Sequence, residues 1–193
     1  MSSFLFYFNW GWEHIISRDA LDHQLFIAAL MAVYLAKDWK QILILVTAFT
    51  IGHSLTLALS VLDWLRIDSK WVEFLIPATI VITCLINLRR LAPTRDQRIW
   101  QYALAGIFGL IHGMGFANNI RFVLAADEQL AINLLGFNLG LEAGQLVVVV
   151  LLMGISVLIV DRLRVARRDW ALFLSAAVFS VALMITLQRI PLD

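Results

Sequence analysis

Long apolar runs alternate with short polar connections along this chain, and the pattern predicts a bundle of membrane-spanning helices. A helix needs about 20 mainly apolar residues to cross the hydrocarbon core. The first run is short for a full crossing, and the fifth is long enough to be tilted or broken. The six runs are residues 21–36, 41–62, 71–88, 99–117, 130–160 and 170–188.

Residues 1–20 are rich in aromatic side chains and are predicted to lie in the membrane interface as an amphipathic segment. Residues 1–193 contain no low-complexity tract or linker, so they are expected to form a single integral membrane domain. The predicted fold is therefore all-α: a polytopic bundle of about six transmembrane helices preceded by an interfacial segment.

Composition supports lipid as the main solvent of the chain. Hydrophobic residues make up 61% of the sequence and charged residues 15%, against about 45–50% and about 25% in a soluble domain. A chain of 193 residues cannot bury that much apolar surface away from water. The net charge of +1 gives no excess of positive charge for a nucleic-acid partner. Membrane lipid is the expected surrounding partner.

Basic residues fall unevenly on the connections between the runs. Ten of the 15 lysines and arginines lie on alternate connections, around residues 37–40, 89–98 and 162–168. The positive-inside rule places these connections in the cytoplasm. Both termini are then predicted to lie outside the cytoplasm.

All four histidines fall at similar depths in this topology. The Asp22-His23 pair opens the first run at its outer end, and the other histidines and two glutamates lie in the outer half or near the middle. The cytoplasmic half of the runs contains no comparable ionisable group and no polar path inward. The further residues of this set are His14, His53, His112, Glu73 and Glu142.

Imidazole and carboxylate groups in one membrane level suit a divalent transition metal. Ionisable side chains inside a membrane are costly and are usually paired and functional. Neutral imidazole is a ligand for zinc, nickel, copper and iron, and carboxylate adds negative charge. Taken singly, each histidine also fits solvation in the headgroups or a hydrogen bond between helices. Together they predict a shared metal or proton site with ligands His14, Asp22, His23, His53, His112 and Glu142, and with Glu73, Asn138 and Gln145 as further candidates.

Glycine and amide positions support a closely packed site. Asn138, Glu142 and Gln145 are spaced i, i+4, i+7 and share one helix face. A run of glycines four residues apart, Gly136 to Gly144, permits close approach of another helix. Glycines also surround His112, and Thr50 and Thr56 lie three residues either side of His53. The second, fourth and fifth runs are therefore predicted to pack around a polar interior.

Four segments resemble the second branch of the HupE/UreJ family of bacterial membrane proteins. The similarity extends over about residues 10–150. The segments are His14-Ile15 with LDHQLF at 21–26, FTIGHSLTL at 49–57, FGLIHGMGFA at 108–117 and FNLGLEAGQ at 137–145.

The resemblance implies a small polytopic protein of the bacterial inner membrane that is linked with nickel or cobalt uptake for hydrogenase and urease maturation. It implies metal ligands at His23 with Asp22, at His112 and at Glu142. His14 and His53 are further candidates.

Three functions remain open on the sequence. The first is a metal permease of the nickel or cobalt kind. The second is an intramembrane hydrolase that acts on a lipid or a membrane-embedded peptide, with His23, His53 and His112 holding zinc and Glu142 or Glu73 as general base. The third is a structural or sensory subunit without metal.

Overall fold

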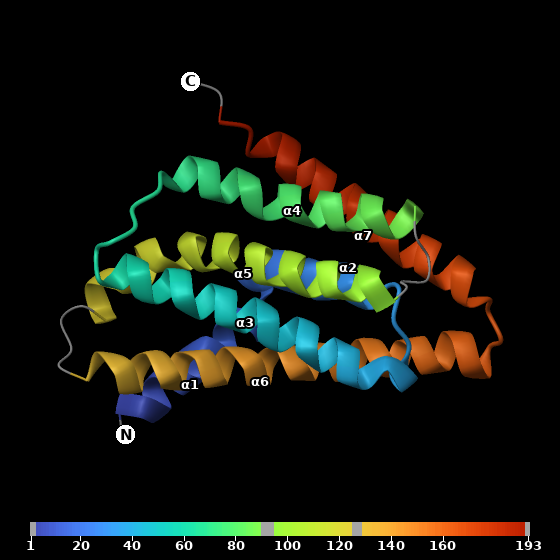
Figure 1. The fold of residues 1–193 in the computed structure, drawn as a ribbon, viewed down its shortest axis with the longest axis horizontal. Coiled ribbons are helices and arrows are strands. Elements are labelled where there is room, and N and C mark those ends of the chain that lie inside the picture. The colour runs from blue at the N-terminus through green and yellow to red at the C-terminus, as the bar shows by residue number, and fades with distance from the viewer. Residues whose placement is uncertain (1–2, 90–94, 125–128, 192–193) are drawn as a thin grey trace.

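The chain folds into a bundle of α-helices (Figure 1). The computed structural model describes residues 3–89, 95–124 and 129–191, with the side chains at 19, 95–98 and 118–124 left out. No strand occurs in these described ranges, and the predicted all-α membrane bundle is confirmed. The helices are α1 (Ser3–Ile16), α2 (Leu21–Met31), α3 (Trp39–Val61), α4 (Ser69–Arg89), α5 (Arg95–Leu124), α6 (Leu130–Ser156) and α7 (Arg167–Gln188).

Five helices, α3 to α7, are long and apolar enough to cross a membrane. A π-helical turn, Val157–Arg162, extends α6 at its C-terminal end. Large apolar side chains cover the outside of the bundle: Ile51, Val150 and Phe173 are 64–68% exposed. Such a surface is stable in lipid and not in water, so the chain is a multi-pass membrane protein.

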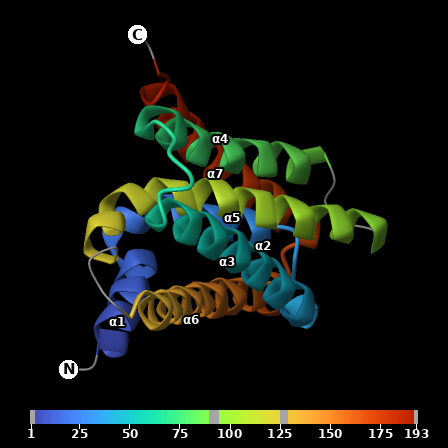
Figure 2. The same ribbon diagram turned by 60° about the vertical axis from the view of Figure 1, so that its left-hand side comes forward.

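The N-terminal segment differs from its prediction, because α1 packs along α6 instead of lying apart in the interface (Figures 1 and 2). A β-carbon on Gly140 would lie 1.9 Å from the carbonyl oxygen of Phe8. A β-carbon on Gly11 would lie 2.0 Å from the carbonyl oxygen of Phe137. Only glycines on both helices permit this approach. The contact could not be predicted, because a single sequence does not show which helix packs against a glycine face.

Helices α1 and α2 together make one broken crossing. Along α1, Phe4 faces Gly136 and Ile15 faces Gly144, so the two helices run parallel. Helix α2 continues in the same direction, and its Ile27 shares a core cluster with Val149 of α6. Five helices of the described chain are long enough to cross alone, so the sixth predicted crossing, residues 21–36, stays a prediction; α2 is too short for it without α1.

Gln24 closes the break between α1 and α2. Its Nε2 donates hydrogen bonds of 3.0 Å to the carbonyl oxygens of Ile15 and Ser17, where α1 ends. Carbonyls at a helix end have no partner within the helix, and lipid supplies none. The side chain of Gln24 therefore makes a helix break possible at this depth.

Helices α3 and α5 share the most extensive contact of any two helices in the described chain. A β-carbon on Gly109 would lie 2.1 Å from the carbonyl oxygen of Phe49, and one on Gly113 would lie 2.4 Å from that of His53. Close packing of the second and fourth predicted runs is therefore confirmed. The glycines of the fifth predicted run, Gly136 to Gly144 on α6, pack against α1 instead.

Candidate metal centre

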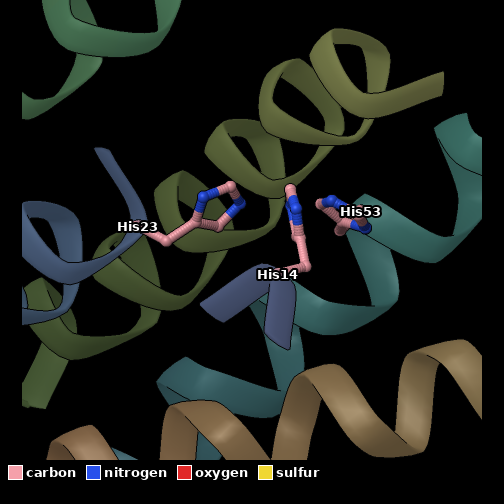
Figure 3. Close-up of side chains that lie close together, drawn as sticks. All are labelled: His14, His23 and His53. Carbon is pink, nitrogen blue, oxygen red and sulfur yellow. The ribbon is translucent and has the colours of Figure 1, made fainter. Parts of the chain in front are cut away.

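The four histidines converge from four helices at one place in the bundle. His14 lies in the last turn of α1 and His23 in the first turn of α2. His53 lies on α3 and His112 on α5. The ring of His23 is central, with centroids 4.7 Å from His14, 6.0 Å from His53 and 5.0 Å from His112. Figure 3 shows three of these rings turned toward one another.

Three of the histidines have the spacing of a metal-binding group. One ring nitrogen from each of His14, His23 and His53 lies within 4.8 Å of the others. Nitrogen ligands lie about 2.0–2.1 Å from an ion such as zinc, so two of them are at most about 4 Å apart. Closure of the rings by roughly 1 Å would let them share one ion.

The ring nitrogens lack other partners within the described part of the chain. Both ring nitrogens of His53 and of His112 are buried without a hydrogen bond. The same holds for Nε2 of His14 and of His23. A buried polar group left unpaired costs about 1–3 kcal/mol. A cation held between the rings would satisfy these atoms, and imidazole suits a divalent transition metal. The residues present therefore fit such an ion.

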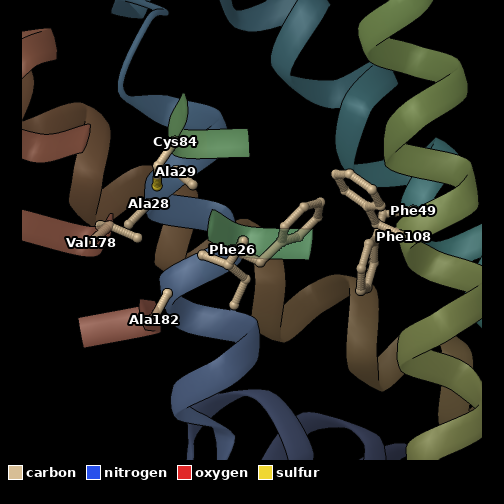
Figure 4. Close-up of a cluster of buried hydrophobic side chains, with 9 residues drawn as sticks. Phe26, Ala28, Ala29, Phe49, Cys84, Phe108, Val178 and Ala182 are labelled. Atoms are coloured by element: carbon tan, nitrogen blue, oxygen red, sulfur yellow. The ribbon is translucent and has the colours of Figure 1, made fainter. Parts of the chain in front are cut away.

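Aromatic rings enclose the histidines on two sides. Toward the C-terminal end of α5 and the N-terminal end of α6, the ring centroid of Phe116 lies 4.0 Å from that of His14 and stacks on Phe137 at 4.9 Å. On the other side, the centroids of Phe26 and Phe49 lie 5.4 and 5.1 Å from that of His112. Phe108, one turn before His112 on α5, belongs to the same buried cluster as Phe26 and Phe49 (Figure 4). These aromatic rings give the histidines apolar surroundings on both sides.

His14 is the most accessible of the four rings. It is half-buried, whereas His23, His53 and His112 are buried. The residue before it, Glu13, lines an open hollow of about 350 Å³ on the side of α1, together with Phe6, Asn9 and Trp10. His14 itself does not line this hollow, and its Nε2 is buried.

The predicted carboxylate ligands have other contacts. Asp22 accepts a hydrogen bond of 3.0 Å from Arg189, which forms an ion pair with it. Glu142 accepts one of 2.9 Å from the Thr47 hydroxyl. Neither belongs to the histidine group within 4.8 Å. Metal ligation by these two carboxylates stays a prediction.

The further candidates lie in different surroundings. Gln145 is buried and accepts a hydrogen bond of 2.9 Å from the Thr50 hydroxyl. Asn138 has a buried Oδ1 without a partner in the described chain. Glu73 is exposed near the start of α4. None of the three is in the histidine group.

Sequence reasoning missed two sets of residues around this site. Gln24, which spans the helix break, gave no signal, because its partners are carbonyls that an unbroken helix would satisfy. The buried α4 residues Thr79, Thr83 and Asn87 follow an i, i+4, i+8 spacing in an apolar run, and that spacing could have revealed a polar face.

A comparison with protein families agrees with this structure. The family described as HupE / UreJ protein matches residues 1–189. The chain belongs to the HupE/UreJ family. The predicted resemblance is thereby confirmed over essentially the whole chain. No curated protein and no solved structure matches this HupE/UreJ protein.

Proposed function

We propose that this HupE/UreJ protein carries a divalent transition-metal ion, nickel or cobalt in kind, across the bacterial inner membrane. The observation that carries the proposal is the convergence of four imidazoles whose buried nitrogens have no other partner in the described chain. These nitrogens can replace water molecules in the coordination sphere of an incoming ion. The proposed orientation, from the distribution of basic residues, puts both termini in the periplasm.

Capture begins at the hollow beside α1 in this proposal. The carboxylate of Glu13 attracts a hydrated cation there, and the half-buried ring of His14 offers the first nitrogen. Rotation of His14 toward His23 and His53 then hands the ion to the buried rings. Imidazole is a neutral ligand when it binds a metal, so no anionic side chain holds the ion at the histidines.

The geometry favours transport over the zinc hydrolase. A hydrolase needs a general base within hydrogen-bond reach of a metal-bound water. The two carboxylates predicted for that role do not belong to the histidine group: Glu142 contacts Thr47, and Glu73 is exposed. Within the described chain, phenylalanine rings occupy the space beside the histidines where a lipid or peptide substrate would lie.

The decisive experiment measures metal binding and metal uptake by the same protein. Purified protein is titrated with nickel, cobalt and zinc, and proteoliposomes are assayed for uptake. His53→Ala and His112→Ala are each expected to lower metal affinity at least 100-fold and to abolish uptake. Ser180→Ala, an exposed hydroxyl on α7, is the matched control and should change neither. Unchanged affinity in both histidine variants would overturn the proposal.

The pH dependence gives an independent check. Imidazole binds metal only in its neutral form, so binding releases any proton that the rings carry. Affinity is therefore expected to fall as the pH is lowered and to recover fully on return to neutral pH. Affinity that stays constant down to the pH at which the protein unfolds would contradict ligation by imidazole.

A further inference from the structure

We propose that α2, α4 and α7 swing as one unit about the break between α1 and α2, and that this movement opens the histidines toward the end of the bundle where α2 ends. This inference rests on the proposed transport function. The orientation proposed above places that end at the cytoplasm. The movement accounts for inward release in a chain whose sequence shows no polar path inward.

Hydrogen bonds join α2 to both α4 and α7. Near the end of α2, the amide of Asn87 on α4 donates a hydrogen bond of 2.6 Å to the carbonyl oxygen of Ala29. Just beyond that end, the guanidinium of Arg167 on α7 donates one of 2.7 Å to the carbonyl oxygen of Val33. Carbonyls at a helix end have no partner within the helix, and lipid supplies none. These bonds therefore favour movement of the three helices together.

Further contacts complete the unit. Helices α4 and α7 lie side by side along one side of the bundle (Figures 1 and 2). Cys84 of α4 and Val178 of α7 belong to one buried cluster with Ala29 of α2 (Figure 4). At the start of α2, Asp22 accepts a hydrogen bond of 3.0 Å from Arg189, which directly follows α7. The three helices are thus in contact along the whole length of α2.

The boundary between this unit and the other helices is formed by flexible apolar side chains. A β-carbon on Gly115 of α5 would lie 2.8 Å from Cδ1 of Ile76 on α4, which is the far end of a side chain. Ile27 of α2 shares a buried cluster with Leu45 of α3 and Val149 of α6. The glycines of the α1–α6 and α3–α5 pairs meet backbone carbonyls instead. Small sliding of packed helices is therefore easier at this boundary than within those two pairs.

The break between α1 and α2 is the pivot of the movement. A 3₁₀ turn, Arg18–Ala20, connects the two helices beside His23. Gln24 ties the start of α2 to the end of α1 through its hydrogen bonds to the carbonyls of Ile15 and Ser17. Hinges consist of a few residues at the ends of helices, which absorb the change in backbone angles.

Two polar contacts cross the boundary at the opposite end of α2, and we call them the latch. The hydroxyl of Tyr34 donates a hydrogen bond of 2.5 Å to Oε1 of Gln101 on α5. A guanidinium nitrogen of Arg167 lies 3.8 Å from a carboxylate oxygen of Asp38, directly before α3. Both contacts join two side chains, so they can open without unfolding a helix.

Phe26 of α2 is the side chain that the movement withdraws from the histidines. Its ring centroid lies 5.0 Å from that of Phe49, 5.7 Å from that of Phe108 and 5.4 Å from that of His112 (Figure 4). Phe49 and Phe108 belong to the paired helices α3 and α5, so Phe26 separates from them when α2 swings. Water then reaches His112 from the latch side and takes the place of imidazole on the ion.

The first experiment bridges the latch. Tyr34→Cys and Gln101→Cys are combined in a Cys84→Ala background and joined by a reducible bifunctional thiol reagent. The bridged protein should keep its nickel affinity within about twofold and lose at least about tenfold in uptake, because the histidines stay in place while opening is prevented. Reduction of the bridge should restore uptake. Undiminished uptake by the bridged protein would overturn the inference.

The matched control bridges two helices of the same unit. Ala29→Cys and Asn87→Cys, joined by the same reagent, replace the hydrogen bond between α2 and α4 with a covalent link. Uptake should equal that of the Cys84→Ala parent, because a rigid unit loses no movement when its own helices are joined. A loss as large as that caused by the latch bridge would show that α2 moves relative to α4, against the inference.

A second measurement does not depend on cross-linking. Gln101→Leu removes the acceptor of the Tyr34 hydroxyl and should speed nickel release to a chelator about threefold, since the open state gains population. Gln101→Glu keeps an acceptor and should release nickel at the wild-type rate. Equal release rates in the two variants would contradict the latch. Wild-type protein that binds no metal would instead refute the proposed function, so the two failures are distinguishable.

Discussion

Two pairs of histidines meet at the metal centre, and the protein holds them in contrasting ways. His53 and His112 belong to α3 and α5, which are continuous helices pressed together at glycines. His14 and His23 lie on either side of the break between α1 and α2. One pair is carried by a rigid support and the other by the ends of two half-helices.

This contrast indicates where movement can occur. Separating α3 from α5 would break close backbone packing, and moving α1 would break its equally close packing on α6, so movement at the break falls to α2. Broken helices recur at the substrate sites of transporters for this reason. We infer that α3 and α5 act as the fixed side of the metal centre and the broken crossing as its moving side.

The largest expected effect comes from disturbing the fixed side. Gly109→Ala would put a methyl group 2.1 Å from the Phe49 carbonyl oxygen, so α3 and α5 must separate. Overpacking of this kind costs about 1–3 kcal/mol or more. We expect a lower melting temperature and a metal affinity reduced at least tenfold, measured by thermal unfolding and nickel titration in detergent.

The control for this change is Gly154→Ala on α6, where the added methyl group meets nothing within 4 Å. It should leave both stability and affinity at wild-type values. Equal behaviour of the two variants would show that α3 and α5 are not a rigid support.

A smaller effect is expected at the moving side. Gln24→Ala removes both side-chain hydrogen bonds across the break, and the Ser17 carbonyl then keeps only its bond from the Ala20 N–H. Loss of a residue that positions ligands commonly costs about 10–100-fold in metal affinity. We expect a fall near the lower end of this range, with less loss of stability than in Gly109→Ala, measured by the same titration and unfolding assays.

Gln188→Ala, an exposed glutamine at the end of α7, is the matched control for Gln24→Ala. Full wild-type affinity in Gln24→Ala would mean that the break needs no side-chain support. The comparison between fixed and moving sides would then lose its basis.

The smallest effect is expected at the Asp22–Arg189 ion pair, which is partly exposed. Exposed ion pairs contribute about 0.2–1 kcal/mol. Asp22→Asn and Arg189→Ala should therefore lower stability slightly and equally, without a change in nickel affinity. A loss of affinity confined to Asp22→Asn would instead place Asp22 among the metal ligands, as the sequence predicted.

The crossings could be predicted from the sequence because apolar length and basic flanks act locally. The runs at 41–62 and 71–88 differ from α3 and α4 by two residues or fewer at each end. The position of α1 could not be predicted in the same way. Its 14 residues are too few for a crossing, and its partner α6 lies more than 100 residues later in the chain.

The metal centre could be predicted in part for a related reason. Helix depth follows from counting residues, so the common level of the histidines was visible in the sequence. Rotation about each helix axis was not visible, and it decides which side chains meet. His23 faces the other histidines, while Glu142 turns to Thr47.

The parallel packing of α1 on α6 also has a consequence for biogenesis. During synthesis, α1 leaves the ribosome first, but the glycine surface that receives it emerges more than 100 residues later. His14 reaches its final neighbours only when Phe137 is in place. An unfinished chain therefore holds an incomplete histidine cluster, which is completed only late in assembly.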